Sequence, residues 1–146
     1  MRIGELAKRT SCDIETIRYY EKSGLLEEPA RSPNGYREYD AHHLERLQFI
    51  RHCRSLQLGL QEIRVLLNLK ANPSAGCTSV DELLEGHIDR VREQMKSLQT
   101  LEQQLVTLRR QCHGPHSVDE CGILQNLNEA AEGSACACHD AEKFNH

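Results

Sequence analysis

The sequence predicts a mainly α-helical chain: an N-terminal winged helix-turn-helix with a small β-hairpin wing, a long helix suited to an antiparallel coiled coil, and a short C-terminal helix. Three observations predict it. All four prolines lie between segments of helical periodicity. Within residues 79–112, apolar residues recur at steps of three and four positions and form a stripe. Hydrophobic residues make up only 38% of the chain and Trp is absent, so we expect stability to depend on oligomerisation.

Two short helices open the chain. In residues 3–10 the apolar side chains recur at helical spacing, and the pattern ends at "SCD". Asp13 can cap a second helix, and Gly24 supplies its left-handed end. Two helices joined by a turn of three residues form a helix-turn-helix.

The next segment, "EPARSPNGYREYD" at residues 28–40, predicts a short β-hairpin. Asn34-Gly35 is a strong signal for a two-residue turn, and arginines and tyrosines flank it. A hairpin of this composition makes a basic wing beside the helix pair. We therefore expect a winged helix-turn-helix.

A third and a fourth helix complete residues 1–75, the predicted winged helix-turn-helix domain. Asp40 can cap the third helix, and Gly59 opens the fourth. Their apolar residues recur every three or four positions: Leu44, Leu47, Ile50, Cys53, Leu60, Ile63, Leu66 and Leu67. The segment "KANPSAGC" then breaks the pattern.

A long helix is predicted within residues 76–112. Ser79 and Glu82 can form a capping box, and no Pro interrupts the chain up to about Cys112. Glu102 stands where a strict heptad would have an apolar residue. The stripe consists of Leu84, Ile88, Val91, Met95, Leu98, Leu101, Leu105 and Leu108. Such a seam predicts a dimerisation helix that pairs with a second copy.

The C-terminal part begins where "HGP" ends the long helix. Ser117 and Glu120 offer a second capping box for a short helix through "CGILQNLNEA". We expect residues 113–132 to form a loop and this helix. Residues 133–146 are small and polar and are predicted to be a flexible tail that contains Cys and His.

Charge and cysteine content limit the functions that we consider. Residues 1–70 hold 12 Lys and Arg against 10 Asp and Glu, whereas residues 71–146 hold 6 against 12, so the two halves should meet different partners. No apolar run could span a bilayer and no cleavable leader is apparent, so we expect a cytoplasmic protein without a membrane partner. Seven cysteines in a reducing compartment favour thiolate chemistry over a disulfide framework. No catalytic constellation appears at meaningful spacing, so an enzyme is not predicted.

Aromatic and basic residues of the first 40 positions predict a DNA-binding surface. All four tyrosines lie there beside arginines, as on many phosphate-facing surfaces. Arginine reaches phosphates or base edges, and tyrosine hydroxyls donate to phosphates. One of two adjacent tyrosines normally packs into the core, so this alternative stays open for Tyr19 and Tyr20. The candidate DNA-binding residues are Thr16, Arg18, Tyr19, Tyr20, Tyr36 and Arg37.

These segments carry a resemblance over nearly the whole chain. "IGELAKRT", "ETIRYYEKSGLL", "NGYREYD" and "LQFIRHCRSL" resemble the MerR family of bacterial transcription regulators. Cys77, Cys112 and Cys121, with "CGILQNL", resemble its cadmium- and lead-responsive branch. The resemblance implies a homodimer on promoter DNA, in which metal binding bends and untwists the duplex for RNA polymerase and so activates metal-resistance genes. Within the family, a cysteine at the position of Cys77 goes with sensing of divalent ions.

The length of the predicted long helix constrains this metal site. From Ser79 to Cys112 it spans about 50 Å at ~1.5 Å per residue, whereas thiolates that share an ion must lie within roughly 4 Å of each other. In an antiparallel dimer, Cys77 of one subunit meets Cys112 and Cys121 of the other. The alternative is a helix that breaks at Gly86 and folds back within one chain.

Three thiolates select soft cations over magnesium or calcium and permit Cd(II), Pb(II), Hg(II) or Zn(II). The positive ends of helix dipoles near Cys77 and Cys121 favour their thiolates. Lead accepts three sulfurs, whereas cadmium and zinc prefer a fourth ligand, which His113 or His116 could supply.

The remaining cysteines and histidines have weaker signals. A second metal site could form from His87, Cys136, Cys138, His139 and His146, although a solvated tail with incidental ligands explains them equally well. Cys12 and Cys53 are expected to be buried as small hydrophobic residues.

Two other classes of function stay open. A thiol redox switch would use a disulfide between Cys112 and Cys121, but three positioned cysteines exceed what one disulfide needs. A metal buffer without a regulatory role is disfavoured by the winged helix-turn-helix.

Overall fold

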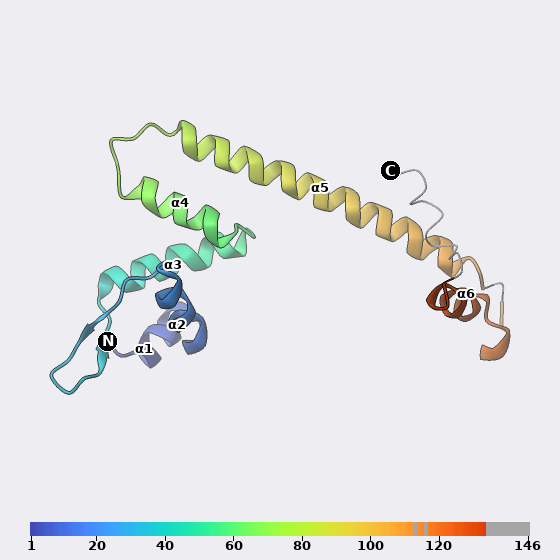
Figure 1. Cartoon of the computed structure of the whole chain (residues 1–146), viewed down its shortest axis with the longest axis horizontal. Coiled ribbons are helices and arrows are strands. Elements are labelled where there is room, and N and C mark those ends of the chain that lie inside the picture. Colours follow the sequence, from blue (N-terminus) through green and yellow to red (C-terminus); the bar gives the residue numbers. More distant parts are fainter. Residues whose placement is uncertain (113, 116, 134–146) are drawn as a thin grey trace. The chain divides into compact units, whose positions relative to one another are not determined.

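The computed structural model describes residues 1–112, 114–115 and 117–133 of the 146-residue chain. Its elements are drawn in Figure 1, and they follow one another as α1 (Ile3–Thr10), α2 (Ile14–Ser23), β1 (Ala30–Arg31), β2 (Arg37–Glu38), α3 (Ala41–Ser55), α4 (Leu60–Lys70), α5 (Thr78–Arg109), the 3-10 helix η1 (Val118–Glu120) and α6 (Gly122–Ala131). The chain divides into two compact units between Leu84 and Glu85. The predicted mainly helical fold with one small hairpin is confirmed. Among the described residues, no helix has both the length and the apolar character needed to cross a bilayer.

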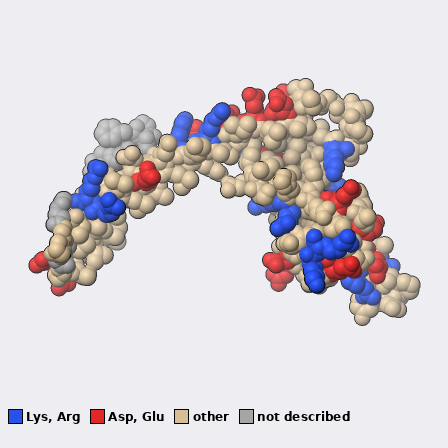
Figure 2. Space-filling view, turned by 180° about the vertical axis from the view of Figure 1, so that it is seen from behind, with Lys and Arg blue, Asp and Glu red and all other residues tan. Residues whose placement is uncertain are grey.

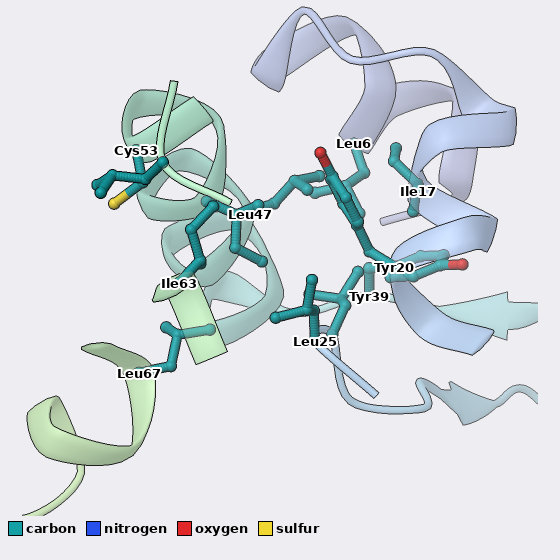
Figure 3. Packing of buried hydrophobic residues seen from close by; sticks show 12 residues of the cluster. Leu6, Ile17, Tyr20, Leu25, Tyr39, Leu47, Cys53, Ile63 and Leu67 are labelled. Carbon is teal, nitrogen blue, oxygen red and sulfur yellow. The ribbon is translucent and has the colours of Figure 1, made fainter. Parts of the chain in front are cut away.

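The first unit has one hydrophobic core, to which α1, α2, α3, α4 and the segments beside the hairpin all contribute (Figure 3). The cluster consists of Leu6, Ile17, Tyr20, Leu25, Leu26, Tyr39, Leu47, Ile50, Cys53, Leu58, Ile63 and Leu67. Cys53 is 6% exposed, as expected for a cysteine on the apolar face of its helix. Cys12 is half-buried and packs against the edge of the cluster. Leu83, in the first turns of α5, also packs against it, so this unit includes the start of the long helix.

The turn between α1 and α2 has the predicted length. Ser11 ends α1 in the left-handed region at φ 54°, and Gly24 ends α2 at φ 81°. Asp13 occupies the N-cap position of α2, but the predicted side-chain cap is wrong. Its side chain makes no capping hydrogen bond, and only its backbone carbonyl accepts from the amide of Ile17, at 3.0 Å.

The hairpin is a two-stranded antiparallel sheet in the register Ala30 to Glu38 and Arg31 to Arg37. This small sheet is the predicted wing.

The hairpin turn differs from the predicted two-residue turn. The amide of Gly35 donates to the carbonyl of Ser32 at 2.8 Å, so Pro33 and Asn34 are the central residues of the turn. Gly35 follows them at φ 81° and completes a loop of three residues. The proline explains the shift, because its fixed φ suits the second position of a β-turn.

The start of α3 is capped as predicted. The side chain of Asp40 accepts from the amide of His43 at 3.1 Å, and the amide of Asp40 donates back to His43 Nδ1 at 3.2 Å. The hydrogen bond from the His43 amide to the carboxylate lowers the pKa of Asp40. His43 is 6% exposed, and its Nε2 lies 3.2 Å from the carbonyl oxygen of Glu27. The cap therefore also ties α3 to the segment before the hairpin.

The two ends of α5 differ from their predictions. The helix begins at Thr78, so the predicted capping box at Ser79 is wrong. Cys77 directly precedes it, and its carbonyl accepts from the amide of Asp81 at 3.0 Å. The helix ends at Arg109, before Cys112, and it continues through Gly86 without a break.

The last two helices also correct a prediction. Ser117 precedes η1 rather than capping a longer helix, and α6 starts only at Gly122. Cys121 therefore occupies the N-cap position of α6 instead of its first turn, and its carbonyl accepts from the amide of Gln125 at 3.0 Å. Favourable capping residues such as Ser117 and Asp119 do not by themselves fix where a helix begins.

Candidate nucleic-acid interface and cysteine site

The second helix of the helix-turn-helix presents a mixed basic and aromatic face to solvent. Ile17 and Tyr20 point into the core with 0% and 8% exposure. The two residues between them, Arg18 and Tyr19, therefore face outward; Tyr19 is 55% exposed. Thr16, directly before Ile17, is half-buried. Arg18 makes no hydrogen bond or ion pair with any of the described residues, so its guanidinium is available to a ligand.

Of the two adjacent tyrosines, Tyr20 packs into the core and Tyr19 lies on the surface. The expectation that one of them is buried is met. Burial raises the pKa of Tyr20, because a phenolate there would lose its hydration. The ring of Tyr19 is 6.1 Å away and lies outside the core. Both tyrosines, with Thr16 and Arg54, line one shallow hollow of the surface, so Tyr20 reaches solvent only at its edge.

The wing carries the other two candidate residues. Tyr36 is 58% exposed, and the guanidinium of Arg2 lies 4.1 Å from its ring centroid, a cation-π contact that orients the ring. Arg37 is partly exposed, and its Nε lies 3.9 Å from Glu21 Oε2. The wing is thus connected to α1 through Arg2 and to α2 through Glu21.

Glu21 is a buried carboxylate that joins α2 to the wing. Its side chain is 7% exposed, and it accepts a hydrogen bond from the hydroxyl of Tyr39. Tyr39 is 2% exposed, and its burial, together with the hydrogen bond to Glu21 and that residue's charge, raises the pKa of Tyr39 strongly. The sequence reasoning missed this pair. Glu21 follows Ile17 by four positions, so its place on the buried face of the helix was the available signal.

Basic and acidic side chains are interspersed over this unit (Figure 2). Residues 1–84 hold 12 Lys and Arg and 12 Asp and Glu, so individual arginines such as Arg18, rather than a large positive field, offer contacts to an anion.

Of the three candidate thiols, Cys77 lies at the amino end of α5 and is exposed. Cys112 and Cys121 belong to the second unit, and both are half-buried. Cys112 Sγ lies 3.9 Å from the carbonyl oxygen of Gly114. None of the five cysteines among the described residues forms a disulfide.

The loop between Cys112 and Cys121 closes on itself. A Cβ atom added to Gly122 would lie 2.2 Å from the carbonyl oxygen of Gln111, a distance that no real contact allows. The residue before one cysteine therefore touches the residue after the other, which brings the two thiols to one end of the second unit. Sequence reasoning missed this closure. Gly122, directly after Cys121, was the available signal, because glycine allows another backbone to approach closely.

The donor set suits a soft metal ion: thiols without a disulfide, two of them half-buried on a closed loop. Within residues 1–112, 114–115 and 117–133 of a single chain, however, no three His, Cys, Asp or Glu side chains are close enough to hold an ion. His87 lies half-buried on α5. The other candidates of the second site, Cys136, Cys138, His139 and His146, lie outside the described residues, as do His113 and His116.

The predicted stripe of α5 faces solvent in the single chain. Its apolar members are between 37% and 64% exposed, apart from the buried Leu108. The exposed ones are Leu84, Ile88, Val91, Met95, Leu98, Leu101 and Leu105. A contiguous apolar stripe of this length marks an interaction surface.

A winged helix-turn-helix with an exposed arginine and tyrosine on its second helix, followed by a long helix with an uncovered apolar stripe, defines a DNA-binding regulatory protein. Comparison with known proteins specifies it further. The profile of the "MerR HTH family regulatory protein" domain matches residues 1–70, and that of "MerR, DNA binding" matches residues 44–108. The chain belongs to the MerR family.

Individual relatives agree over most of the chain. The HTH-type transcriptional regulator ZntR of Escherichia coli K12 is 37% identical over 139 residues, which cover 94% of this chain and 99% of the relative. The mercuric resistance operon regulatory protein of Bacillus cereus is 35% identical over 126 residues, 86% of this chain and 96% of the relative. Among solved structures, the transcription regulator PbrR691 from Ralstonia metallidurans CH34 in complex with lead(II) is 51% identical, with a TM-score of 0.76, and the match covers 87% of this chain and 98% of that one. These relatives are regulators, and the prediction that the chain is not an enzyme is confirmed.

Proposed function

We propose that this protein is a cytoplasmic, homodimeric regulator that binds promoter DNA and activates metal-resistance genes when it binds a soft divalent ion, Pb(II) or Cd(II). The ligands are Cys77 of one subunit with Cys112 and Cys121 of the other. One observation carries the proposal: Cys77 directly precedes α5, and Cys112 and Cys121 follow it, so the thiols flank a single uninterrupted helix of 32 residues.

The length of that helix favours a site shared between two chains. At ~1.5 Å per residue, 32 residues extend about 48 Å, whereas thiolates bound to one ion at ~2.3 Å each lie within roughly 4 Å of one another. A second copy that runs antiparallel along the exposed stripe brings the opposite helix end to Cys77. Such a dimer holds two sites.

The chemistry of three thiolates supports a soft ion. Together with a divalent cation they leave one net negative charge, and sulfur ligands disfavour magnesium and calcium. The 51% identity to a regulator solved with lead(II) supports lead as the inducer. Cadmium would be held by the same three thiolates and a fourth ligand.

The DNA contacts that we propose come from the exposed side chains of α2 and the wing. Arg18 reaches a base edge or a phosphate, and Thr16 and Tyr19 flank it. Tyr36 and Arg37 contact phosphates from the wing. Tyr20 contributes only the edge of its ring that reaches the hollow.

Metal binding can activate transcription only if one conformation of the dimer binds the ion better than the other. We propose that the metal-bound conformation holds the promoter bent and untwisted, so that RNA polymerase engages it. The sequence-dependent stiffness of the spacer then sets the deformation energy that the protein must supply.

A mixed dimer tests the shared site. Cys77→Ser and Cys112→Ser chains carry different affinity tags, and the purified dimers are titrated with Pb(II) while thiolate-to-lead absorption in the ultraviolet is followed. We expect two ions per wild-type dimer, none per mutant homodimer and one per mixed dimer. Cys12→Ser, outside the site, serves as the control and should keep two. A mixed dimer without any site would sink the proposal.

Two observations favour alternative functions, a response to Hg(II) and a thiol redox switch, and both can be tested with the same protein. The 35% identical relative is named for mercuric resistance, so Hg(II) is titrated beside Pb(II), Cd(II) and Zn(II) with a promoter fusion as readout. The closed loop also places Cys112 and Cys121 at one end of a unit, as a redox switch would need. Induction that survives a chelator but disappears with a reductant would replace metal sensing by that switch.

A further inference from the structure

We propose that Arg64 and Arg46 are positioning residues for DNA recognition, which hold the carboxyl end of α2 onto α4 and α3. The inference rests on the proposed DNA-binding function and adds two residues that touch no DNA. Its basis is a pair of short side-chain hydrogen bonds to the backbone at the end of the recognition helix.

Both guanidinium groups donate to carbonyl oxygens around Gly24. Arg64 Nη2 lies 2.6 Å from the carbonyl oxygen of Ser23, and Arg46 Nε lies 2.6 Å from that of Leu25. Both arginines are half-buried, and hydrogen bonds with a charged donor are stronger than neutral ones. The two bonds come from different helices and hold one short stretch of chain between them.

The end of α2 provides acceptors that its own backbone cannot satisfy. The last carbonyls of a helix have no intrahelical donor. Here the carbonyls of Tyr20 and Glu21 accept from the amides of Leu26 and Gly24, at 3.1 and 3.2 Å. The carbonyl of Ser23 has no such amide and takes Arg64 instead. Its position at the negative end of the helix dipole further favours a guanidinium.

The close approach of Arg64 is built into the turn. Gly24 has a φ of 81°, and a Cβ atom on it would lie 3.4 Å from Arg64 Nη1, so the guanidinium lies directly against this residue. After the turn, Leu25 and Leu26 enter the core with 0% and 1% exposure. The chain around Gly24 is thus fixed on one side by the core and on the other by the two arginines.

The consequence concerns the residues proposed to meet DNA. Tyr19 and Arg18 precede Ser23 by four and five positions, about one helical turn, so any tilt of the carboxyl end of α2 moves them directly. On the other side, a connection over residues 71–77 joins the end of α4 to the start of α5, where Leu83 packs on the same core. Arg64 therefore links the reading helix to the element that leads to the proposed metal ligand.

The chain supplies a control outside the proposed DNA-binding surface. Arg92 lies on α5, where its Nη1 is 3.5 Å from Asp89 Oδ1. Arg92→Met and Arg64→Met each remove one guanidinium and one positive charge, whereas Arg64→Lys keeps a positive donor.

The test uses full-length protein and two DNA duplexes: one that the wild type selects from a random-sequence library, and a shuffled duplex of the same length and composition. Fluorescence anisotropy gives the ratio of the two dissociation constants. We expect Arg64→Met to reduce this preference about tenfold, the effect of roughly one misplaced base contact, and Arg46→Met to act in the same direction. Binding to the shuffled duplex and its salt dependence should stay unchanged. Arg64→Lys should recover part of the preference, and Arg92→Met should keep it within about twofold.

Amide hydrogen exchange of the free protein provides a second readout that needs no DNA. Arg64→Met should accelerate exchange of the Gly24 and Leu26 amides about tenfold relative to amides of α3, because the end of α2 opens more often. Unchanged exchange together with an unchanged duplex preference overturns the inference, as does an equal loss of preference in Arg92→Met. A wild type without any duplex preference defeats the proposed function instead, and that failure is seen before any variant is made.

Discussion

Gly122 shows how one residue can decide the geometry of a binding loop. Because its absent Cβ leaves room for the carbonyl of Gln111, the chain can close between Cys112 and Cys121. No cysteine spacing reveals such a contact, since it depends on two backbones that meet across the loop. The sequence proposes the three thiols as ligands, but it does not predict the closure.

The first prediction is that Gly122→Ala weakens Pb(II) binding at least about tenfold, because the added methyl group forces the loop open at a cost of about 1–3 kcal/mol. Competitive titration with a chelator of known affinity measures the change. Gly86→Ala is the control: its Cβ would meet nothing closer than Arg90 Nη1 at 3.8 Å, so it should keep metal affinity and stabilise α5 by about 0.5–1 kcal/mol. Equal affinity of both variants would show that closure does not position the thiols.

The second prediction concerns Tyr39 and Glu21. Tyr39→Phe removes the donor to a buried carboxylate, so we expect the free energy of unfolding in urea at pH 7 to fall by about 1–3 kcal/mol. Glu21→Gln, which keeps an acceptor without the charge, should cost less. Equal stability of Tyr39→Phe and the wild type would mean that Glu21 finds another partner.

The same pair predicts a pH dependence. The raised pKa of Tyr39 means that the folded state prefers the neutral phenol. This contribution is complete below the ordinary tyrosine pKa of about 10 and is lost as the pH rises through the higher folded value, with a slope of up to about 1.4 kcal/mol per pH unit. Urea unfolding between pH 8 and 11 should show a shallower decline for Tyr39→Phe than for the wild type. Parallel curves would contradict the assignment.

At the scale of elements, periodicity predicted every helix of the first unit, while local capping signals were less reliable. Asp40 caps the start of α3 and Gly24 ends α2, both as expected. At each of these boundaries no neighbouring residue offers the same capping chemistry. Thr78 and Ser79 are both acceptable at the start of α5, and the pattern cannot choose between neighbours with equal chemistry. Pro33 moved the hairpin turn by one residue for a reason that the dipeptide Asn34-Gly35 does not contain.

A further prediction tests whether the apolar stripe of α5 forms the dimer interface. Leu98 is 64% exposed in the single chain and should be buried in the dimer. Leu98→Glu removes about 1.5–3 kcal/mol of apolar burial for each copy and places a charge in the seam, so the dimer dissociation constant should rise at least about 100-fold. Sedimentation at several concentrations measures it. Gln99→Glu adds the same charge beside the stripe and should leave the dimer intact; a monomer from both would indicate a charge effect only.

For the whole molecule, the order of the helices and the hairpin followed from the sequence, because helical periodicity and proline positions are local properties. The site did not follow in the same way. Its proposed ligands flank the two ends of one helix. In the proposed dimer they meet only between two copies, so the geometry around the ion would depend on how the two chains associate. The only sequence signal for this association is the apolar stripe. The stripe indicates that α5 has a partner, but it does not fix the register in which two helices pair.

The burial of Ile17 and Tyr20 on α2 has a mechanical consequence. Successive residues of a helix are separated by about 100° around its axis, so a turn of α2 by a single residue would expose Ile17 and push Arg18 toward the core. The recognition helix therefore cannot change its reading face by spinning in place. In the proposed dimer, a metal signal that leaves this core intact therefore moves α2 together with its domain, without rotating the helix about its own axis.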